Sequence, residues 1–229
     1  MTEALPTTVP DAVVFDLDGV LLDTTEAMRC AFSSVWHAAG RTAPLPFDEF
    51  LGQMGAPLTA ILGSFGLSSA YVPVYEAAST ARQDLVRPYD GMTDILHAVR
   101  AAGIPTAVAT GKTRQRALEA LRTGGLVELL DTVVGSDQVE RPKPDPEILH
   151  TALHRLLGRH IPPQRAVFVG DSVLDMRCGR AAGVPTIAVG WGQTPPAVLL
   201  GERPSAFVTS PADLLPLLAV RSVQEVSLD

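Results

Sequence analysis

The chain has 229 residues, of which 46% are hydrophobic and 19% are charged, and its formal net charge is −7. This composition indicates a well-filled globular core and excludes a disordered chain. It also argues against nucleic acid as a partner, because phosphate contacts need clustered Lys and Arg side chains.

The first predicted strand, residues 12–15, leads directly into Asp16 and Asp18. Its apolar, β-branched residues suit a central parallel strand that is covered on both faces. Ionised Asp is rarely buried without a partner, and alternate residues of an extended chain point to the same side. In open α/β sheets, ligands bind beyond the carboxyl ends of the strands. The two acids therefore predict a divalent cation and a reaction that needs a carboxylate.

Residues 24–86 carry helical patterns and no convincing strand. Thr24 or Thr25 is expected to cap the first of these helices. The first strand therefore finds its sheet neighbours only after a helical insertion, which would lie over the carboxyl edge of the sheet. The expected domains are a core of residues 1–23 and 87–229 and a helical cap of residues 24–86, with hinges at the two junctions.

Strand and helix patterns alternate from Gly91 onward. Asp145 followed by Pro146 is typical of a helix start, with an acidic cap and a proline in the first turn. Strands that alternate with helices of this length imply right-handed crossovers and a parallel sheet. The predicted fold class is therefore α/β, a doubly wound, Rossmann-like parallel sheet with an inserted α-helical cap. The later strands are expected at residues 106–110, 132–135, 166–171, 186–189 and 206–208.

Three further polar groups follow predicted strands. Thr110 and Gly111 offer hydroxyl and backbone N–H donors that suit phosphate oxygens. Lys143 lies between two prolines, whose fixed φ holds its ammonium group in a stiff loop. Asp171 and Asp175 add two acids at a strand-to-helix turn. With the acids of the first strand they would repel by about 4 kcal/mol per pair at 4 Å and an effective dielectric near 20, and Mg²⁺ with the lysine would offset that repulsion.

With these four motifs in order, the chain resembles the haloacid dehalogenase superfamily of phosphohydrolases, in the branch with a helical cap after the first strand. The resemblance covers nearly the whole chain. It implies that Asp16 is the nucleophile that becomes aspartyl-phosphate and that Asp18 is the general acid and base. It also implies that Mg²⁺ is held by the Asp16 carboxylate, the Asp18 backbone carbonyl and Asp171, with Asp175 as a supporting residue.

The resemblance assigns the phosphoryl oxygens to Thr110, Gly111 and Lys143, and it implies that Lys143 also orients the nucleophile. Dehalogenases and phosphonate hydrolases of the superfamily lack an acid two residues after the nucleophile, where this chain has Asp18. The sugar-phosphate mutases of the same superfamily, of the β-phosphoglucomutase type, typically carry a His where this chain has Met28. Among the phosphatases, the motifs resemble phosphoglycolate phosphatases and those associated with 3-amino-5-hydroxybenzoate synthesis.

We therefore expect a Mg²⁺-dependent phosphatase that hydrolyses a small phosphate monoester through an aspartyl-phosphate. A sugar-phosphate mutase is the nearer alternative. A non-catalytic phosphate-binding switch is the other, since such domains also combine acids, Thr and Lys on a doubly wound sheet. Gln53 and Met54, on a glycine-flanked loop, are the candidates for the substrate end of the cap.

The expected partner is a small phosphorylated metabolite, and the composition is compatible with a monomer or a homodimer. No apolar stretch approaches the roughly 20 residues of a membrane span, so a membrane is not an expected partner. The first basic residue is Arg29, which argues against a secretory signal and favours the cytoplasm. Cys30 and Cys178 lack the paired spacing of a disulfide framework or a zinc site.

Overall fold

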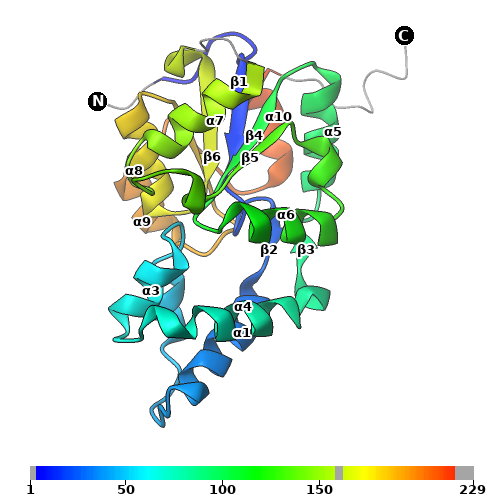
Figure 1. Ribbon diagram of the computed structural model, residues 1–229. Coiled ribbons are helices and arrows are strands. Elements are labelled where there is room, and N and C mark those ends of the chain that lie inside the picture. The colour runs from blue at the N-terminus through cyan, green and yellow to red at the C-terminus, as the bar shows by residue number, and fades with distance from the viewer. Residues whose placement is uncertain (1–3, 158–161, 220–229) are drawn as a thin grey trace.

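The computed structural model describes residues 4–157 and 162–219. Within these residues a six-stranded sheet has the order β5-β4-β1-β6-β7-β8 (Figure 1), and all neighbouring strands are parallel. The predicted α/β fold class is confirmed, and each predicted strand begins at the expected residue. The strands are β1 (Ala12–Phe15), β4 (Thr106–Ala109), β5 (Thr132–Val134), β6 (Ala166–Gly170), β7 (Thr186–Val189) and β8 (Ala206–Val208).

Strand β1 lies in the middle of the sheet, between β4 and β6. Val13 and Phe15 pack into one apolar cluster, whereas Ala12 and Val14 pack into another. This alternation is what a strand geometry dictates. Because both faces are covered, every residue of β1 is apolar and buried, and the polar groups begin where the strand ends.

Helices of the core form one layer on each face of the sheet (Figure 1). Helices α5, α6 and α10 pack on the Phe15 side, and α7 and α8 pack on the Val14 side. Asp145 Oδ1 accepts a hydrogen bond of 3.0 Å from the Glu147 backbone N–H, which confirms the predicted cap of α7. These helices are α5 (Met92–Ala101), α6 (Arg114–Thr123), α7 (Glu147–Leu157), α8 (Val173–Ala182), α9 (Pro196–Gly201) and α10 (Leu214–Leu217), with 3₁₀ turns η3 (Val127–Leu129), η4 (Ser136–Gln138), η5 (Pro163–Arg165) and η6 (Pro211–Asp213).

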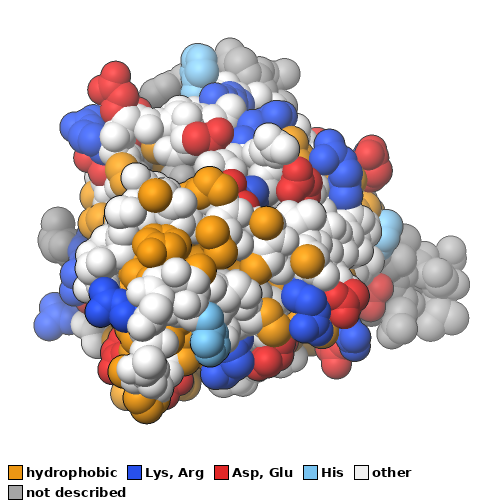
Figure 2. All heavy atoms as spheres, turned by 60° about the horizontal axis from the view of Figure 1, so that its bottom comes forward, with side chains coloured by type: hydrophobic (Ala, Val, Ile, Leu, Met, Phe, Trp, Pro, Cys, Tyr) orange, Lys and Arg blue, Asp and Glu red, His pale blue; other side chains and the backbone are white. Residues whose placement is uncertain are grey.

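The segment between the first strands and the rest of the sheet is helical and lies beyond the carboxyl edge (Figure 1). Its aromatic side chains share one apolar cluster, in which the Phe32 and Phe50 ring centres are 4.6 Å apart. A small helical segment cannot bury all of its apolar side chains. Some of them gather on the face of the molecule shown in Figure 2. We call residues 24–86 the cap; its helices are α1 (Thr25–Ala38), α2 (Phe47–Leu51), α3 (Leu58–Ser64) and α4 (Val72–Thr80), with η1 (Ser69–Tyr71) and η2 (Gln83–Leu85).

A short antiparallel pair joins the two ends of the cap to the core. Strand β2 (Leu22–Asp23) pairs with β3 (Arg87–Pro88). Strands of this length have no periodicity, so the sequence did not predict them. The expected capping role of Thr24 is wrong: it holds the N-cap position of α1 without a side-chain cap, because its hydroxyl donates to Asp18. In the described residues, no helix combines the length and apolar character needed to cross a membrane.

Candidate active site

Asp16 and Asp18 follow β1 and are buried, with 2% and 4% of their surface exposed. The chain turns at Gly19, whose φ is +79°, a conformation that side chains other than glycine rarely adopt. A Cβ atom at this position would lie 2.0 Å from Asp171 Oδ2. Glycine therefore permits both the turn and the close approach of Asp171 to the end of β1.

Lys143 links two of the acids from the loop before α7. Its ammonium group donates hydrogen bonds of 2.8 Å to Asp16 Oδ1 and 2.7 Å to Asp175 Oδ1. Burial disfavours the ammonium charge, but the two carboxylates outweigh it and raise the pKa of Lys143. Asp175 Oδ2 accepts from the Ser172 backbone N–H at 3.1 Å and from its hydroxyl at 2.6 Å. Both oxygens of Asp175 are thus engaged, which suits the supporting position expected for it.

Asp171 is the acid with a spare oxygen. Its Oδ2 accepts a hydrogen bond of 2.8 Å from the Gln193 backbone N–H. In the part of the chain that the structure describes, its Oδ1 is buried without a hydrogen-bond partner. Carboxylate oxygens of Asp16, Asp171 and Asp175 lie within 4.8 Å of one another. An unpartnered buried carboxylate oxygen in such a cluster is costly.

Burial is the main cause that raises the pKa of both Asp16 and Asp171, and the neighbouring acids add to it. The pKa of Asp16 rises to about 7 even though Lys143 lowers it, and the pKa of Asp171 rises well above its usual value. A divalent cation would favour the ionised forms and occupy the spare oxygen of Asp171. The all-oxygen donor set suits Mg²⁺, which prefers carboxylates, carbonyls and water.

The hydrogen-bond partners of Asp18 come from the start of the cap and from the loop after β4. Lys112 donates a hydrogen bond to Asp18 Oδ2, and the Thr24 hydroxyl donates one of 2.5 Å to Oδ1. Burial raises the pKa of Asp18, but Lys112 and Thr24 outweigh that effect and the pKa is lowered. For Lys112, burial outweighs the attraction of Asp18 and lowers the pKa. The two acids after β1 therefore lie in opposite electrostatic surroundings.

Thr110 and Gly111 follow β4 and border the same cavity as Asp16 and Asp18. Thr110 is buried, and its hydroxyl oxygen accepts a 3.3 Å hydrogen bond from the Lys112 backbone N–H. A Cβ atom on Gly111 would lie 2.6 Å from the Gly55 carbonyl oxygen in the cap. The cap backbone therefore touches the candidate phosphate-binding loop directly.

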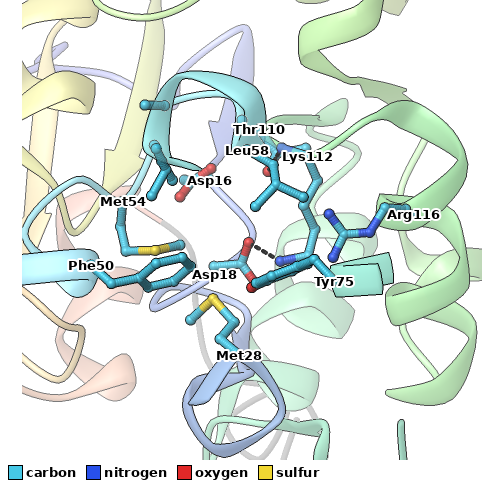
Figure 3. A pocket seen from close by; sticks show the side chains of 14 residues that line it. Asp16, Asp18, Met28, Phe50, Met54, Leu58, Tyr75, Thr110, Lys112 and Arg116 are labelled. Atoms are coloured by element: carbon cyan, nitrogen blue, oxygen red, sulfur yellow. Dashed lines mark hydrogen bonds and ion pairs between the residues drawn. The ribbon is translucent and has the colours of Figure 1, made fainter. Parts of the chain in front are cut away.

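The cavity between cap and core has a volume of about 30 Å³ and contains the acids in one wall (Figure 3). Of the two cap candidates, Met54 lines it, whereas the Gln53 amide donates to the Glu49 carbonyl oxygen at 3.3 Å. Apolar cap side chains and two cations make up most of the other walls. The full lining is Asp16, Asp18, Met28, Phe50, Met54, Gly55, Ala56, Leu58, Ile61, Tyr75, Thr110, Gly111, Lys112 and Arg116.

The structure brings together every core residue predicted for the site and adds four that the sequence analysis missed. Lys112 belongs to the motif that starts at Thr110, but the motif does not show that the Lys112 side chain bonds to Asp18. Arg116 comes four residues later in the first turn of α6, and its place in the sequence does not show that its side chain reaches the cavity. Thr24 bonds an acid six residues earlier and Gln193 bonds one 22 residues earlier, and neither contact follows from a strand or helix repeat.

Comparisons with known proteins identify a family and several relatives. A model of the haloacid dehalogenase-like hydrolase family matches residues 13–189. The pyrophosphatase PpaX of Bacillus velezensis is 31% identical over 215 residues, which cover 92% of this chain and 97% of the relative. The N-acetylmuramic acid 6-phosphate phosphatase of Pseudomonas aeruginosa is 34% identical over 193 residues, 81% and 84% of the two chains. A haloacid dehalogenase-like family hydrolase of Streptococcus pneumoniae superposes with a TM-score of 0.76 at 25% identity, covering 91% of this chain and 98% of that one.

Proposed function

The chain belongs to the haloacid dehalogenase-like hydrolase family, and we propose that it is a Mg²⁺-dependent phosphatase that hydrolyses a small phosphate monoester through an aspartyl-phosphate on Asp16. The observation that carries the proposal is the placement of Asp16. It is bound to Lys143 and belongs to a cluster of buried acids. It also shares a cavity with a second acid and the donors of Thr110 and Gly111.

The residues fit a divalent cation, because Asp171 Oδ1 is buried and lacks a partner among the described residues. The Asp16 carboxylate, the Asp18 backbone carbonyl and Asp171 would hold it. When bound, Mg²⁺ supplies positive charge that offsets the charge of the phosphoryl oxygens. Lys143 adds a second positive charge on the Asp16 side, and Asp175 keeps it in place.

In the first half of the reaction, a carboxylate oxygen of Asp16 attacks phosphorus. A phosphorus–oxygen bond forms to Asp16 while the bond to the leaving oxygen breaks. Asp18, in its protonated form, donates its proton to that leaving oxygen. Lys143 holds the carboxylate through Oδ1, and Thr110 and Gly111 donate hydrogen bonds to the phosphoryl oxygens. Their contribution is positioning and charge stabilisation, which phosphoryl transfer needs most.

In the second half, a water molecule attacks the phosphorus of the aspartyl-phosphate. Asp18, now ionised, accepts a proton from this water. The bond between phosphorus and Asp16 breaks, inorganic phosphate is released, and Asp16 returns as a carboxylate. A single residue can serve both halves because it gives one proton to the leaving oxygen in the first and gains another from water in the second.

The proposal includes movement of the cap. A cavity of about 30 Å³ has room for about two water molecules, which is too little for a phosphate ester. The loop at Gly55 and Ala56 closes one wall against Gly111. We propose that the cap moves as a unit about its two junctions with the core, opening for substrate and closing to exclude bulk water.

Two alternative activities are separable from this one. Pyrophosphate is a second candidate substrate, because PpaX is 31% identical over nearly the whole chain. A sugar-phosphate mutase needs a further acid-base group beside the substrate. Met28 lines the cavity near Asp18, and a thioether cannot act as a base.

The test is release of inorganic phosphate from a panel of phosphate esters and pyrophosphate, with Mg²⁺. We expect multiple turnovers, with free phosphate rather than an isomerised ester as the product. Asp16→Asn should lower kcat by at least about 10⁴-fold, because it removes the nucleophile. Asp94→Asn, at an exposed position on α5, is the matched control. Substantial phosphate release by a pure Asp16→Asn preparation contradicts the nucleophile assignment, and no turnover on any compound contradicts the proposed function.

A further inference from the structure

Arg116 is a cation that the proposed chemistry does not use. It belongs to α6 in the core, yet its side chain is only 13% exposed and lines the cavity opposite the cap. Its guanidinium carbon lies 5.3 Å from the centre of the Tyr75 ring in the cap. The Arg116 side chain therefore spans the boundary between the two parts of the molecule.

The polar contacts of this guanidinium are long. One nitrogen lies 3.5 Å from the Ser79 hydroxyl, and Nε lies 3.9 Å from a carboxylate oxygen of Glu76, whose side chain is 38% exposed. A guanidinium group has five N–H donors, and an ion pair at this distance with an exposed carboxylate is weak. Arg116 thus keeps donor capacity at the wall of the cavity, where planar donors bind carboxylate or phosphate well.

Arg116 lies on the side of the cavity where the leaving group must be. In Figure 3, Asp16 is at one end, Asp18 and Lys112 lie in the middle, and Arg116 lies beyond Lys112. Asp18 protonates the leaving oxygen in the proposed reaction, so the rest of the substrate extends to its side. Arg116 also borders a groove of about 330 Å³ between cap and core, which offers space for that extension.

The cations on this side are only partly paired without a ligand. The described cavity lining holds two carboxylates, Asp16 and Asp18; Lys112 pairs with Asp18, whereas the ion pair of Arg116 is with Glu76 at 3.9 Å. When Asp18 carries the proton that it must donate, Lys112 loses the anion it is paired with, and among the described residues Arg116 keeps only the long ion pair with the exposed Glu76. Buried charges are costly unless they are paired, so a second anion on the substrate would stabilise the closed complex.

We infer that Arg116 is a specificity residue that selects phosphate compounds whose leaving group carries a second negative charge, a carboxylate or a phosphate. This inference rests on the proposed phosphatase function and adds the chemical class of its substrate. The side chain acts on the leaving group and not on the phosphoryl group that is transferred to Asp16.

The test compares matched substrates in one assay of phosphate release. Phosphoglycolate carries a carboxylate where 2-hydroxyethyl phosphate carries a neutral hydroxymethyl group, and pyrophosphate supplies a second phosphate. We expect Arg116→Gln to lower kcat/KM for phosphoglycolate or pyrophosphate about 10- to 100-fold more than for 2-hydroxyethyl phosphate, as loss of a charge-assisted hydrogen bond implies. Arg116→Lys should restore part of the difference. Arg114→Gln removes the same charge from an exposed position on α6 and should leave the ratio unchanged.

The arms of this experiment separate the sources of the anion. A loss confined to phosphoglycolate assigns a carboxylate, and a loss confined to pyrophosphate assigns a phosphate. Equal losses on all three compounds, in Arg116→Gln and Arg116→Lys alike, overturn the inference, because Arg116 would then act on the transferred group or on folding. A wild-type enzyme that turns over the neutral ester as efficiently as both anionic compounds overturns it too, while the phosphatase function stands.

Discussion

Asp16 and Asp18 show how strongly local surroundings separate two residues of one type. Burial raises the pKa of Asp16 to about 7, whereas Lys112 and Thr24 overcome burial and lower the pKa of Asp18. The proposed roles need the reverse, an ionised nucleophile and a protonated acid. Mg²⁺ beside Asp16 would favour its ionised form. A bound phosphoryl group would compete for Lys112, and the pKa of Asp18 would then rise.

Lys112→Met tests this control of the acid. Loss of the nearby positive charge disfavours the ionised form of Asp18, so its pKa in the free enzyme should rise. Because Asp18 must be protonated to act on the leaving oxygen, the alkaline limb of the kcat/KM profile should move to higher pH. The measurement is the pH dependence of phosphate release. Arg114→Met is the matched control, and an alkaline limb at the same pH in Lys112→Met would show that Lys112 does not govern Asp18.

At the scale of elements, the contact between cap and core is made partly by backbone. A Cβ atom on Gly111 would lie 2.6 Å from the Gly55 carbonyl oxygen and 2.7 Å from that of Ala56. On Gly55, a Cβ atom would lie 2.9 Å from the Ser172 hydroxyl. Backbone atoms cannot move aside as the end of a flexible side chain can. Glycines at these positions therefore let the cap reach its closed position.

Gly111→Ala should hold the cap away from the core. We expect kcat/KM to fall at least about tenfold, because closure excludes water and completes the site, while the melting temperature changes little. Steady-state phosphate release and thermal unfolding are the two measurements. Gly63→Ala is the control, since a Cβ atom there meets open space within a cap helix and Ala favours helix over Gly. Full activity in Gly111→Ala would mean that this contact is not needed for closure.

The elements that the sequence predicted well are those with a strong periodic or capping signal. The apolar run of β1 and the Asp145 start of α7 both correspond to elements of the structure. Order along the chain also predicted which polar groups meet, because parallel strands end at one edge. The pairing of β2 with β3 was not predictable, since two-residue strands lack a pattern. The directions of Thr24 and Lys112 were not predictable either: the first is set by the turn between β1 and α1, and the second by packing between segments far apart in the sequence.

At the scale of the whole molecule, the fold buries acids at one edge of its sheet. Asp16 has an ordinary pKa of 3.8 when unfolded and about 7 when folded, and the pKa of Asp171 is also raised. The folded state therefore binds these protons more tightly than the unfolded state does. Their contribution to stability is fully present below about pH 4 and is lost as the pH rises through about 7. Groups with lowered pKa values, such as Asp11 and Glu202, contribute in the opposite direction, but their contribution is complete above about pH 5.

Metal-free protein should therefore melt at a lower temperature as the pH rises from 5 to 7.5. Mg²⁺ should reverse the loss, because it replaces the protons at Asp16 and Asp171. At a concentration 100 times its Kd, a ligand adds about 2.7 kcal/mol, which corresponds to a rise of roughly 5–10 °C in Tm for a chain of this size. The rise should be smaller at pH 5, where protons compete for the same oxygens. Thermal unfolding of chelator-treated protein, with and without Mg²⁺, measures both effects.

Asp171→Asn separates the metal from the general effect of pH. The variant loses a buried negative charge, so it should be more stable than the wild type without metal at pH 7.5, and Mg²⁺ should raise its Tm much less. The Asp94→Asn control should respond to Mg²⁺ as the wild type does. If Mg²⁺ left the Tm of the wild type unchanged at pH 7.5, Asp16 and Asp171 would not share a cation. Burial and the neighbouring acids would then keep their pKa values raised at pH 7.5, and the positive charge for phosphoryl transfer would come from Lys143 and Lys112.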